Sequence, residues 1–375
     1  MFLNNYRLLR IFLLTFVFAV LGVWVFHSSQ EKSQVVKGKW LIAHTPENAR
    51  LVEQAREFAK NVFERTQGKL QFELIFPPPK VRDGNNFSVA VDTMLAGEAD
   101  VSQIGIGALA TLDDKFQILD MPYLFKNHDH AARVLDGDIG QRIRDNFLAS
   151  NKEIRSLDFT YSGGYRIFVS NKPIRSAEDL AGNRILSYRK KSLFESPEAP
   201  PEDEGVRKLT QKVFGFKLIS PTNIENMSSV LDFFRRGDIS IAEDHFSHFT
   251  RVFKKFGIVP NKMHYFWETN HSLFMTSIVV REKFFQSLSP EAQKILVEES
   301  RILALKERED SIQVDAYAKT WLINSGYDVS VPSRSEKKKL EKMVEPVYSQ
   351  FKEKLGADII EKIQELGNRM EISAK

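Results

Sequence analysis

The sequence predicts an α/β protein with two lobes, and three observations support this fold class. A length of 375 residues gives room for about two domains. The first third of the chain alternates strand-like and helix-like segments in the order β-α-β-α-β, which is typical of a lobe built on parallel strands. Towards the end of the chain, residues 290–324 form one helical pattern that is long enough to lie across both lobes.

The elements of the first third follow from hydrophobic periodicity. Alternating apolar residues predict strands, and apolar residues at i, i+3 and i+4 spacing predict amphipathic helices. We expect strands at residues 39–43, 70–76 and 100–104, and helices at residues 47–65, 87–96 and 128–135. Glycines and prolines that follow several of these segments predict where the elements end.

The middle of the chain begins with Gly163, Gly164, Tyr165 and Arg166, which predict a turn. A short capped helix and a small apolar strand at residues 184–187 follow it. Residues 195–205 are rich in Pro and Glu, a composition that predicts an exposed loop. Beyond the loop, the periodicity predicts helices at residues 206–214 and 224–235 and strands at residues 216–219 and 239–242.

The last third of the chain is predicted to be mostly helical. Ser289 caps the long helix, and Pro290 occupies its first position, where a missing N–H costs nothing. Two further helical segments, at residues 335–355 and 358–366, close the chain. We find no internal repeat or low-complexity tract.

The N-terminus has the pattern of an export signal. Arg7 and Arg10 precede an uncharged, mostly apolar run at residues 11–26. Residues 26–29 offer a poor cleavage site, so residues 1–35 are interpreted as a signal peptide or an uncleaved membrane anchor with its connector. The chain contains no cysteine, which excludes both a lipid-modified cysteine and a disulfide. The predicted location is the periplasm, either free or tethered to the inner membrane.

Charge and motifs exclude several classes of function. Lys and Arg total 53 and Asp and Glu total 49, a balance that does not indicate a nucleic-acid groove. No HExxH, Walker A, GxSxG or CxxC motif is present. Residues 105–110 imitate a GxGxxA dinucleotide fingerprint, but they follow the third strand rather than the first, so we interpret them as a backbone turn. No cofactor is therefore predicted.

Several segments, in a specific order and spacing, resemble one protein family. They are the LAGEAD sequence at residues 95–100, and residues 118–125, 131–135, 170–182, 237–243, 269–271 and 287–291. In this order they resemble the substrate-binding proteins of tripartite ATP-independent periplasmic (TRAP) transporters, the DctP-like family. The resemblance covers about residues 39–366.

The resemblance implies a two-lobed periplasmic binding protein fold, with the long helix spanning both lobes. It implies lobe I at residues 36–162 with a return segment around 273–315, and lobe II at residues 163–272 with C-terminal helices at 316–375. Closure of the lobes would trap a ligand, and the closed form would dock on a membrane permease.

Arg166 is the first candidate ligand-binding residue, since the resemblance places a site arginine there. A guanidinium holds a carboxylate with two parallel hydrogen bonds; a surface arginine on a turn is the alternative. Leu186 occupies the position of the family's second arginine, which predicts a ligand other than a simple dicarboxylate. Arg184 shares a strand face with Leu186 and substitutes only if the register shifts. Arg189 lies where the family has an asparagine near the ligand, and a solvated basic loop is the alternative.

The acidic and histidine-rich residues 243–248 are the second candidate site. Glu243 matches the family's glutamate, Asp244 its site asparagine and His245 its proline. Carboxylates and imidazoles at such spacing can bind a divalent metal, but a specific ligand spacing is missing, so no metal is predicted. Met227 lies where the family usually stacks an aromatic ring, and a core methionine is an equal interpretation.

Residues of the first lobe complete the candidate ligand-binding set. His44 and Thr45 follow the first strand, and Gly105 follows the third. Ligands of open α/β sheets bind beyond the carboxyl ends of the strands, which is where these three residues are expected to lie.

The sequence thus predicts an extracytoplasmic solute-binding protein without catalytic activity. It is expected to capture a small organic acid or related polar metabolite and to deliver it to a TRAP-type permease. The alternative is a membrane-tethered ligand sensor of the same fold that acts on a signalling partner. A hydrolase using Asp244 and His245 is disfavoured, because no nucleophile motif accompanies them.

Overall fold

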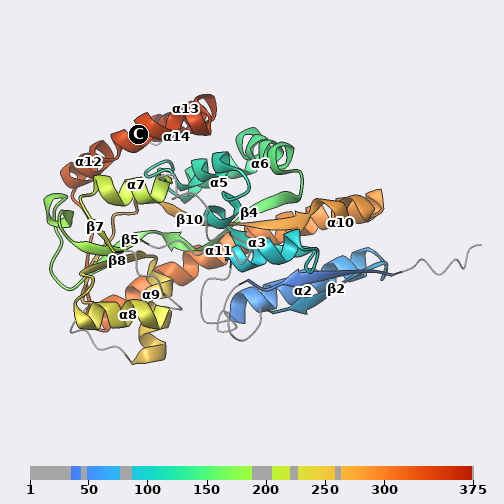
Figure 1. Cartoon of the computed structure of the whole chain (residues 1–375), viewed down its shortest axis with the longest axis horizontal. Coiled ribbons are helices and arrows are strands. Elements are labelled where there is room, and N and C mark those ends of the chain that lie inside the picture. The colour runs from blue at the N-terminus through green and yellow to red at the C-terminus, as the bar shows by residue number, and fades with distance from the viewer. Residues whose placement is uncertain are drawn as a thin grey trace, which may run out of the picture.

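The computed structural model describes residues 35–43, 49–76, 87–187, 205–219, 227–257 and 263–373. Two mixed sheets and a small two-stranded sheet carry the fold, with helices around them (Figure 1). The predicted export signal, His44, Thr45, Arg189 and most of the loop at residues 195–205 lie outside the described residues.

The first sheet has five strands in the order β2-β1-β3-β10-β4. Its strands are β1 (Val36–Leu41), β2 (Leu70–Ile75), β3 (Val101–Gly105), β4 (Ile154–Tyr165) and β10 (Leu273–Arg281). β1 pairs in parallel with β2 and β3, whereas β10 is antiparallel to β3 and β4. The helices α2 (Ala49–Arg65) and α3 (Phe87–Leu95) separate the parallel strands along the chain. The predicted β-α-β-α-β lobe is confirmed.

The second sheet has four strands in the order β11-β9-β5-β8. They are β5 (Ile167–Ser170), β8 (Ile241–Asp244), β9 (Tyr265–Trp267) and β11 (Asp328–Ser330), and β6 (Arg184–Leu186) pairs separately with β7 (Lys217–Ile219). The helices here are α7 (Val206–Val213), α8 (Met227–Arg236) and α9 (Phe246–Phe256). Phe249, Phe253 and Phe266 pack edge to face or tilted in its core, an arrangement that aromatic rings favour.

The two sheets are joined by two adjacent extended crossovers. Arg166 is the single residue between β4 of the first sheet and β5 of the second, and residues 268–272 lead from β9 back to β10. The Arg166 N–H donates to the Ser272 carbonyl at 2.7 Å, and the His271 N–H donates to the Arg166 carbonyl at 3.3 Å. The crossovers therefore lie side by side, as the hinge of a two-lobed protein requires.

The long helix α11 (Pro290–Asn324) forms a third connection. It contacts β4 and α2 on the side of the first sheet and α9 and β11 on the side of the second (Figure 1). The Ser289 hydroxyl accepts the Ala292 N–H at 3.2 Å, so the predicted cap and the predicted length are both confirmed.

Short helices complete the first half of the chain. They are α4 (Ile106–Leu109), the 3₁₀ helix η2 (Asp114–Asp120), α5 (His128–Asp136), α6 (Asp138–Asn151) and the 3₁₀ helix η3 (Glu178–Leu180), and α10 (Glu282–Ser287) precedes the long helix. No element was predicted for α6 or for the first part of β4.

The predicted turn at residues 163–166 is wrong, because Gly163, Gly164 and Tyr165 are the last residues of β4. The glycines serve close approach instead. A Cβ at Gly163 would lie 2.2 Å from the His245 ring, and one at Gly164 would lie 2.4 Å from the Asp315 carboxylate. A side chain at either position would require His245 or Asp315 to move away from β4.

The helix predicted at residues 335–355 is divided into α12 (Arg334–Met343) and α13 (Glu345–Leu355), followed by α14 (Ala357–Ser373). Pro346 stands in the first turn of α13 and has no N–H, so a continuous helix cannot pass through it. α13 contacts α7 and η2, and α14 contacts α5 and α6. The C-terminal helices thus reach elements of both halves, and the division of the chain between lobes stays a prediction.

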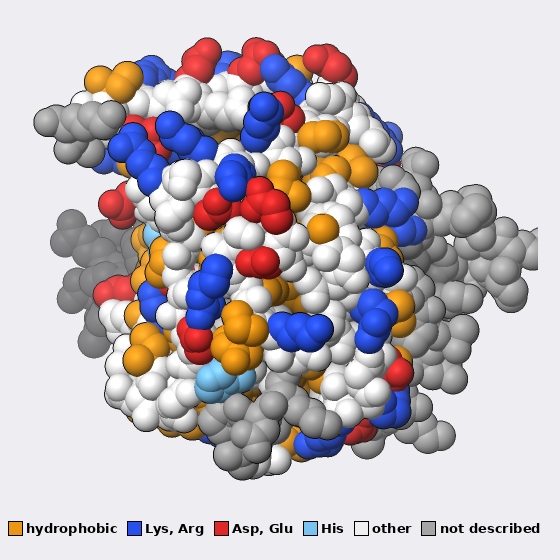
Figure 2. All heavy atoms as spheres, turned by 90° about the vertical axis from the view of Figure 1, so that its left-hand side faces the viewer, with side chains coloured by type: hydrophobic (Ala, Val, Ile, Leu, Met, Phe, Trp, Pro, Cys, Tyr) orange, Lys and Arg blue, Asp and Glu red, His pale blue; other side chains and the backbone are white. Residues whose placement is uncertain are grey.

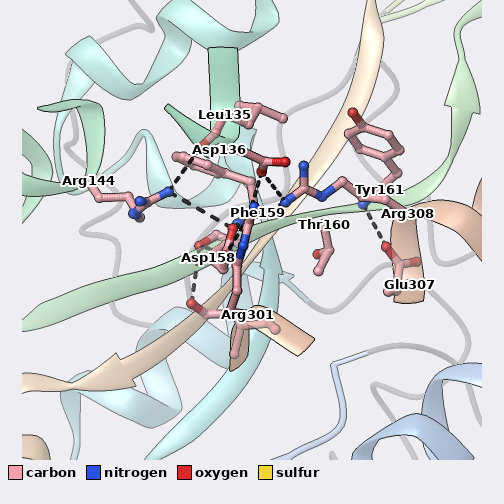
Figure 3. Close-up of polar contacts among 12 residues, drawn as sticks. Leu135, Asp136, Arg144, Asp158, Phe159, Thr160, Tyr161, Arg301, Glu307 and Arg308 are labelled. Atoms are coloured by element: carbon pink, nitrogen blue, oxygen red, sulfur yellow. Dashed lines mark hydrogen bonds and ion pairs between the residues drawn. The ribbon is translucent and has the colours of Figure 1, made fainter. Parts of the chain in front are cut away.

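A cluster of charges around the buried Asp158 and Arg308 fastens α11 to the first sheet (Figure 3). We call Asp136, Arg144, Asp158, Arg301 and Arg308 the α11 ion cluster. Arg308 Nη2 lies 2.7 Å from Asp136 Oδ1 and 3.4 Å from Asp158 Oδ1. Arg301 Nη1 lies 3.3 Å from Asp158 Oδ2, and Arg144 donates to the Leu135 carbonyl at 3.2 Å. Three guanidiniums from two helices thereby converge on β4.

One face of the molecule carries both signs of charge side by side. On the face shown in Figure 2, Lys and Arg side chains alternate with Asp and Glu side chains among the described residues. This agrees with the balanced composition. Across the described ranges, no helix combines the length and apolar character that crossing a bilayer requires.

Candidate functional site

Three ionisable side chains meet where the crossovers pass β8. Arg166 comes from the β4–β5 junction, Glu243 from β8 and His271 from the β9–β10 crossover. Glu243 Oε1 lies 3.5 Å from Arg166 Nη1 and 3.6 Å from His271 Nε2. Arg207, in the first turn of α7, places its Nε 3.4 Å from the same oxygen. We call Arg166, Arg207, Glu243 and His271 the crossover cluster.

Neighbouring contacts hold these side chains in place. Gln211 Nε2 donates to Glu243 Oε2 at 3.0 Å, and the Thr269 hydroxyl lies 2.7 Å from His271 Nδ1. The His271 ring stacks on Phe168 with centroids 4.5 Å apart and an interplanar angle of 10°. The Arg166 guanidinium lies 4.7 Å over the Phe274 ring, within the range of a cation–π contact.

Burial and mutual charge set the protonation of the crossover cluster. Burial by itself raises the pKa of Glu243, but Arg207, the His271 hydrogen bond and Arg166 outweigh it and hold this pKa below its usual range. Burial lowers the pKa of His271, since a charged imidazole would be desolvated there. Burial also lowers the pKa of Arg166, and the nearby Arg207 adds to this effect. Glu243 is therefore ionised at neutral pH and neutralises part of the positive charge around it.

A small pocket opens onto the crossover cluster. Its lining includes Asp120 of η2, Arg166, Phe168, Gln211 and Phe214. Burial raises the pKa of Asp120, and the two arginines only partly oppose this. The pocket combines guanidiniums with aromatic walls, a combination that suits a carboxylate attached to a small organic group.

A second ionisable group begins at the next residue of β8. Asp244 Oδ2 lies 2.5 Å from His248 Nδ1, and Asp244 Oδ1 lies 3.4 Å from His245 Nε2. Burial raises the pKa of Asp244, but His248 and His245 outweigh it and hold this pKa below its usual range. The potential ligand atoms of the three residues all lie within 4.8 Å of one another, so these residues can hold a metal ion.

The structure brings some of the predicted site residues together and separates others. Arg166 and Glu243 are in contact, and Asp244 follows Glu243 on β8. Gly105 ends β3 in the first sheet, where it pairs with Thr276, and a Cβ there would lie 2.5 Å from the Phe87 ring. Met227 is the first residue of α8, and its side chain is outside the described part of the chain. His44, Thr45 and Arg189 are likewise outside it.

Leu186 does not line an ionic site. It is 7% exposed and packs in the hydrophobic cluster that contains Ile167 and Val230. Arg184, its predicted substitute, donates through Nε to the Asp238 carbonyl at 2.8 Å and through Nη2 to the Gly237 carbonyl. Its guanidinium is thus held by backbone carbonyls that follow α8. It therefore does not take the place of the arginine that Leu186 replaces.

Three residues of the crossover cluster and its pocket were not predicted as site residues. Asp120 and His271 stand in segments that were recognised only as family motifs, and Arg207 follows a loop that carried no site signal. The start of α7 is fixed by Gln117, whose side-chain oxygen accepts the Val206 N–H at 3.0 Å. This long-range contact sets Arg207 beside Glu243, and local sequence does not encode it.

Comparison with known proteins adds independent findings. Residues 42–197 and 260–354 match the family described as bacterial extracellular solute-binding protein, family 7. The C4-dicarboxylate-binding protein DctB of Bacillus subtilis (strain 168) is 22% identical over 320 residues, which cover 83% of this chain and 81% of that protein.

Solved structures share the fold. A TRAP periplasmic solute-binding protein from Ochrobactrum anthropi matches with a TM-score of 0.74 at 18% identity, covering 91% of this chain and 97% of its own. Another, from Pseudomonas putida F1 with bound D-glucuronate, matches with a TM-score of 0.70 at 19% identity, covering 88% and 97%.

Proposed function

Because the chain belongs to family 7 of the bacterial extracellular solute-binding proteins, we propose that it binds a small organic acid between its lobes and delivers it to a TRAP-type membrane permease. The observation that carries the proposal is the position of Arg166. It is the one residue that joins β4 of the first sheet to β5 of the second, so a ligand held by its guanidinium lies at the hinge.

The Arg166 guanidinium has the geometry of a group that can accept a further partner. Its 3.5 Å separation from Glu243 exceeds the roughly 2.7–2.9 Å of a tight charge-assisted hydrogen bond. A ligand carboxylate can therefore compete for it with two short bonds. Glu243 keeps Arg207 and His271 as partners when that happens.

The ligand class follows from Leu186 and Arg184. The B. subtilis relative is named for C4-dicarboxylates, whereas the P. putida structure holds D-glucuronate, which has one carboxylate. In this chain Leu186 lies in an apolar cluster and Arg184 is bound to backbone carbonyls. These contacts favour a monocarboxylate, such as a sugar acid, over a C4-dicarboxylate.

Calorimetric titration tests the proposed ligand class. We expect D-glucuronate or another monocarboxylate to bind more tightly than succinate. A charge-assisted hydrogen bond contributes roughly 1.5–3 kcal/mol, so Arg166→Ala should weaken binding by about ten- to a hundredfold. The matched control is Arg184→Ala, which removes an arginine of β6 in the separate two-stranded sheet and should leave affinity unchanged. Tight succinate binding that survives Arg166→Ala would contradict the proposal.

The membrane relationship is a separate part of the proposal. The apolar run at residues 11–26 serves either as a cleaved signal peptide or, with its poor cleavage site, as an uncleaved inner-membrane anchor, and the second arrangement also suits a ligand sensor. The mass of the mature N-terminus distinguishes a retained segment from a cleaved one. A screen for binding partners in the membrane then separates a permease from a signalling protein.

A further inference from the structure

We propose that Asp244, His245 and His248 form a binding site for one divalent transition-metal ion. The site lies where β8 ends and α9 begins, with His245 as the N-cap of α9. Asp244 and His248 are separated by one helical turn across this junction, and His245 lies between them in sequence.

The distances suit a zinc-type site. Nitrogen and oxygen ligands bound at about 2.0–2.1 Å in a tetrahedral arrangement lie about 3.3 Å apart. His245 Nε2 and Asp244 Oδ1 are 3.4 Å apart, and all three potential ligand atoms fall within 4.8 Å of one another. The hydrogen bond of 2.5 Å between Asp244 and His248 must open slightly to admit an ion, which a small side-chain rotation provides.

The surroundings of His245 support the same assignment. Its Nε2 faces Asp244, while its Nδ1 lies 2.7 Å from the Ser247 hydroxyl and 3.6 Å from Asp315 Oδ1 of α11. A metal-bound histidine usually donates its second ring N–H to a hydroxyl or carboxylate, which fixes the ring. Without metal, this Nδ1 accepts the His248 N–H at 3.2 Å, so metal binding would exchange that contact for donation to Ser247.

The backbone leaves room for the imidazole. A Cβ at Gly163 would lie 2.2 Å from the His245 ring, and Gly164 has the same relation to Asp315. The two glycines of β4 therefore allow both His245 and Asp315 to approach the strand closely. The His245 side chain is 4% exposed, whereas those of Asp244 and His248 are 18% and 22% exposed. The site is thus shielded from solvent at His245 and reached by solvent at Asp244 and His248. Such partial access suits a site with three protein ligands and one exchangeable position.

The ligand set selects the kind of metal. Two imidazoles and one carboxylate suit Zn²⁺, Co²⁺ or Ni²⁺, whereas Mg²⁺ and Ca²⁺ prefer oxygen ligands alone. A bound ion would also reverse the local charge. The Asp244 carboxylate alone repels an anion, while a divalent ion on it attracts one.

The role of this metal rests on the proposed function. If an organic acid binds in the cleft, the exchangeable position on the metal can accept a carboxylate or hydroxyl oxygen of that acid. It would then supply the positive charge that Leu186 does not. Arg166 and the metal would hold the acid from neighbouring residues of the second sheet, since β5 and β8 are paired.

Metal titration without any acid tests the site directly. The exported protein is purified without a polyhistidine tag, stripped with EDTA, dialysed, and titrated with ZnCl₂ by calorimetry and with CoCl₂ by visible absorption. We expect one metal ion per chain and Co²⁺ bands of a tetrahedral complex. His248→Ala should weaken binding more than tenfold, and Asp315→Asn, which acts through His245, should weaken it about ten- to a hundredfold.

His264→Ala is the matched control, because this histidine directly precedes β9, which β5 separates from β8, and it lies beside Tyr327, so its loss should leave the metal affinity unchanged. Circular dichroism checks that each variant folds. Failure of the wild-type protein to bind Zn²⁺ or Co²⁺, or binding that is unchanged in both His248→Ala and Asp244→Asn, would overturn the site.

The role in acid binding is tested separately with D-glucuronate in the presence of Zn²⁺ and of EDTA. Weaker binding in EDTA would support the role. Acid binding that depends on Arg166 but is equal in Zn²⁺ and EDTA would overturn the metal's role while leaving the proposed function intact.

Discussion

The α11 ion cluster and the crossover cluster are each built around a buried carboxylate, Asp158 in the first and Glu243 in the second, yet they differ in how their charges are satisfied. In the α11 ion cluster, Arg308 lies 2.7 Å from Asp136, and three guanidiniums surround two carboxylates (Figure 3). In the crossover cluster the guanidiniums of Arg207 and Arg166 and the imidazole of His271 lie 3.4–3.6 Å from Glu243, and the group faces a pocket.

This difference separates a structural role from a binding role. Arg301 and Arg308 of α11 bind Asp136 at 2.5 Å and 2.7 Å, and both also face Asp158 of β4 at 3.3–3.4 Å, so the cluster is a fixed part of the frame. The longer contacts around Glu243 leave the Arg166 guanidinium able to exchange partners. Burial alone does not distinguish the two, because a buried charge needs partners in either case.

The largest effect is expected from a substitution that breaks the α11 ion cluster. Asp158→Ala leaves Arg301 and Arg308 without one of their two carboxylates, and removing one partner of a buried pair costs about 3–5 kcal/mol. Urea denaturation should show this loss in the free energy of unfolding. Asp145→Ala on the exposed face of α6 is the control and should change stability by less than about 0.5 kcal/mol. A loss from Asp158→Ala no larger than that of the control would show that the cluster does not hold α11.

Arg166→Ala should have the opposite pattern to Asp158→Ala, with a large loss of ligand affinity and a small loss of stability. It removes the guanidinium that is proposed to hold the ligand carboxylate, so we expect ligand affinity to fall by about 1.5–3 kcal/mol. Stability should fall by less than in Asp158→Ala, because Arg207 and His271 remain as partners. Measuring both quantities on both variants sharpens the comparison. A larger stability loss in Arg166→Ala than in Asp158→Ala would remove the distinction between the clusters.

The crossover cluster should also respond to mild acid through His271. Burial lowers the pKa of His271, so the unfolded chain takes up a proton near pH 6.5 while the folded protein does not. The stabilising contribution is present above about pH 6.5 and decreases as the pH falls below it. In His271→Gln, the slope of the unfolding free energy plotted against pH should decrease between pH 5 and pH 6.5, by at most about 1.4 kcal/mol per pH unit. An unchanged slope would contradict the assignment, and Asp136→Asn in the α11 ion cluster, which contains no histidine, provides the control.

The smallest expected effect concerns neither cluster. Ser289→Ala removes the hydroxyl that accepts the Ala292 N–H and should cost about 1 kcal/mol of stability. Ser289→Asp keeps a capping oxygen and should restore most of it. Affinity for the acid should stay unchanged in both variants, as thermal unfolding and calorimetry together would show. A change in affinity would indicate that α11 couples its N-terminus to the crossovers.

Local patterns predicted most of the fold. The periodicity of α2, the alternation of β2 and the Ser289–Pro290 start of α11 are all short-range signals, and the structure confirms them. The two glycines of β4 predicted a turn where the structure has a strand, since Gly-Gly is a strong local turn signal. Their actual reason is the approach of His245 and Asp315, which are distant in sequence.

The candidate site was predicted less completely, for the same reason. Arg166 and Glu243 came from a family resemblance, and their contact is observed. Arg207 joins them only because Gln117 fixes the start of α7, and His271 only because two crossovers are hydrogen bonded. Such contacts depend on the tertiary fold and leave no pattern in the local sequence.

Ligand-dependent closure about the crossovers is the central claim, and small-angle X-ray scattering tests it most directly. The exported protein is measured alone and with a saturating amount of the acid that binds most tightly in calorimetry. We expect the radius of gyration to decrease on binding in the wild-type protein and in Arg184→Ala, and to stay unchanged in Arg166→Ala at the same acid concentration. An unchanged radius of gyration in wild-type protein that calorimetry shows to be saturated would contradict closure.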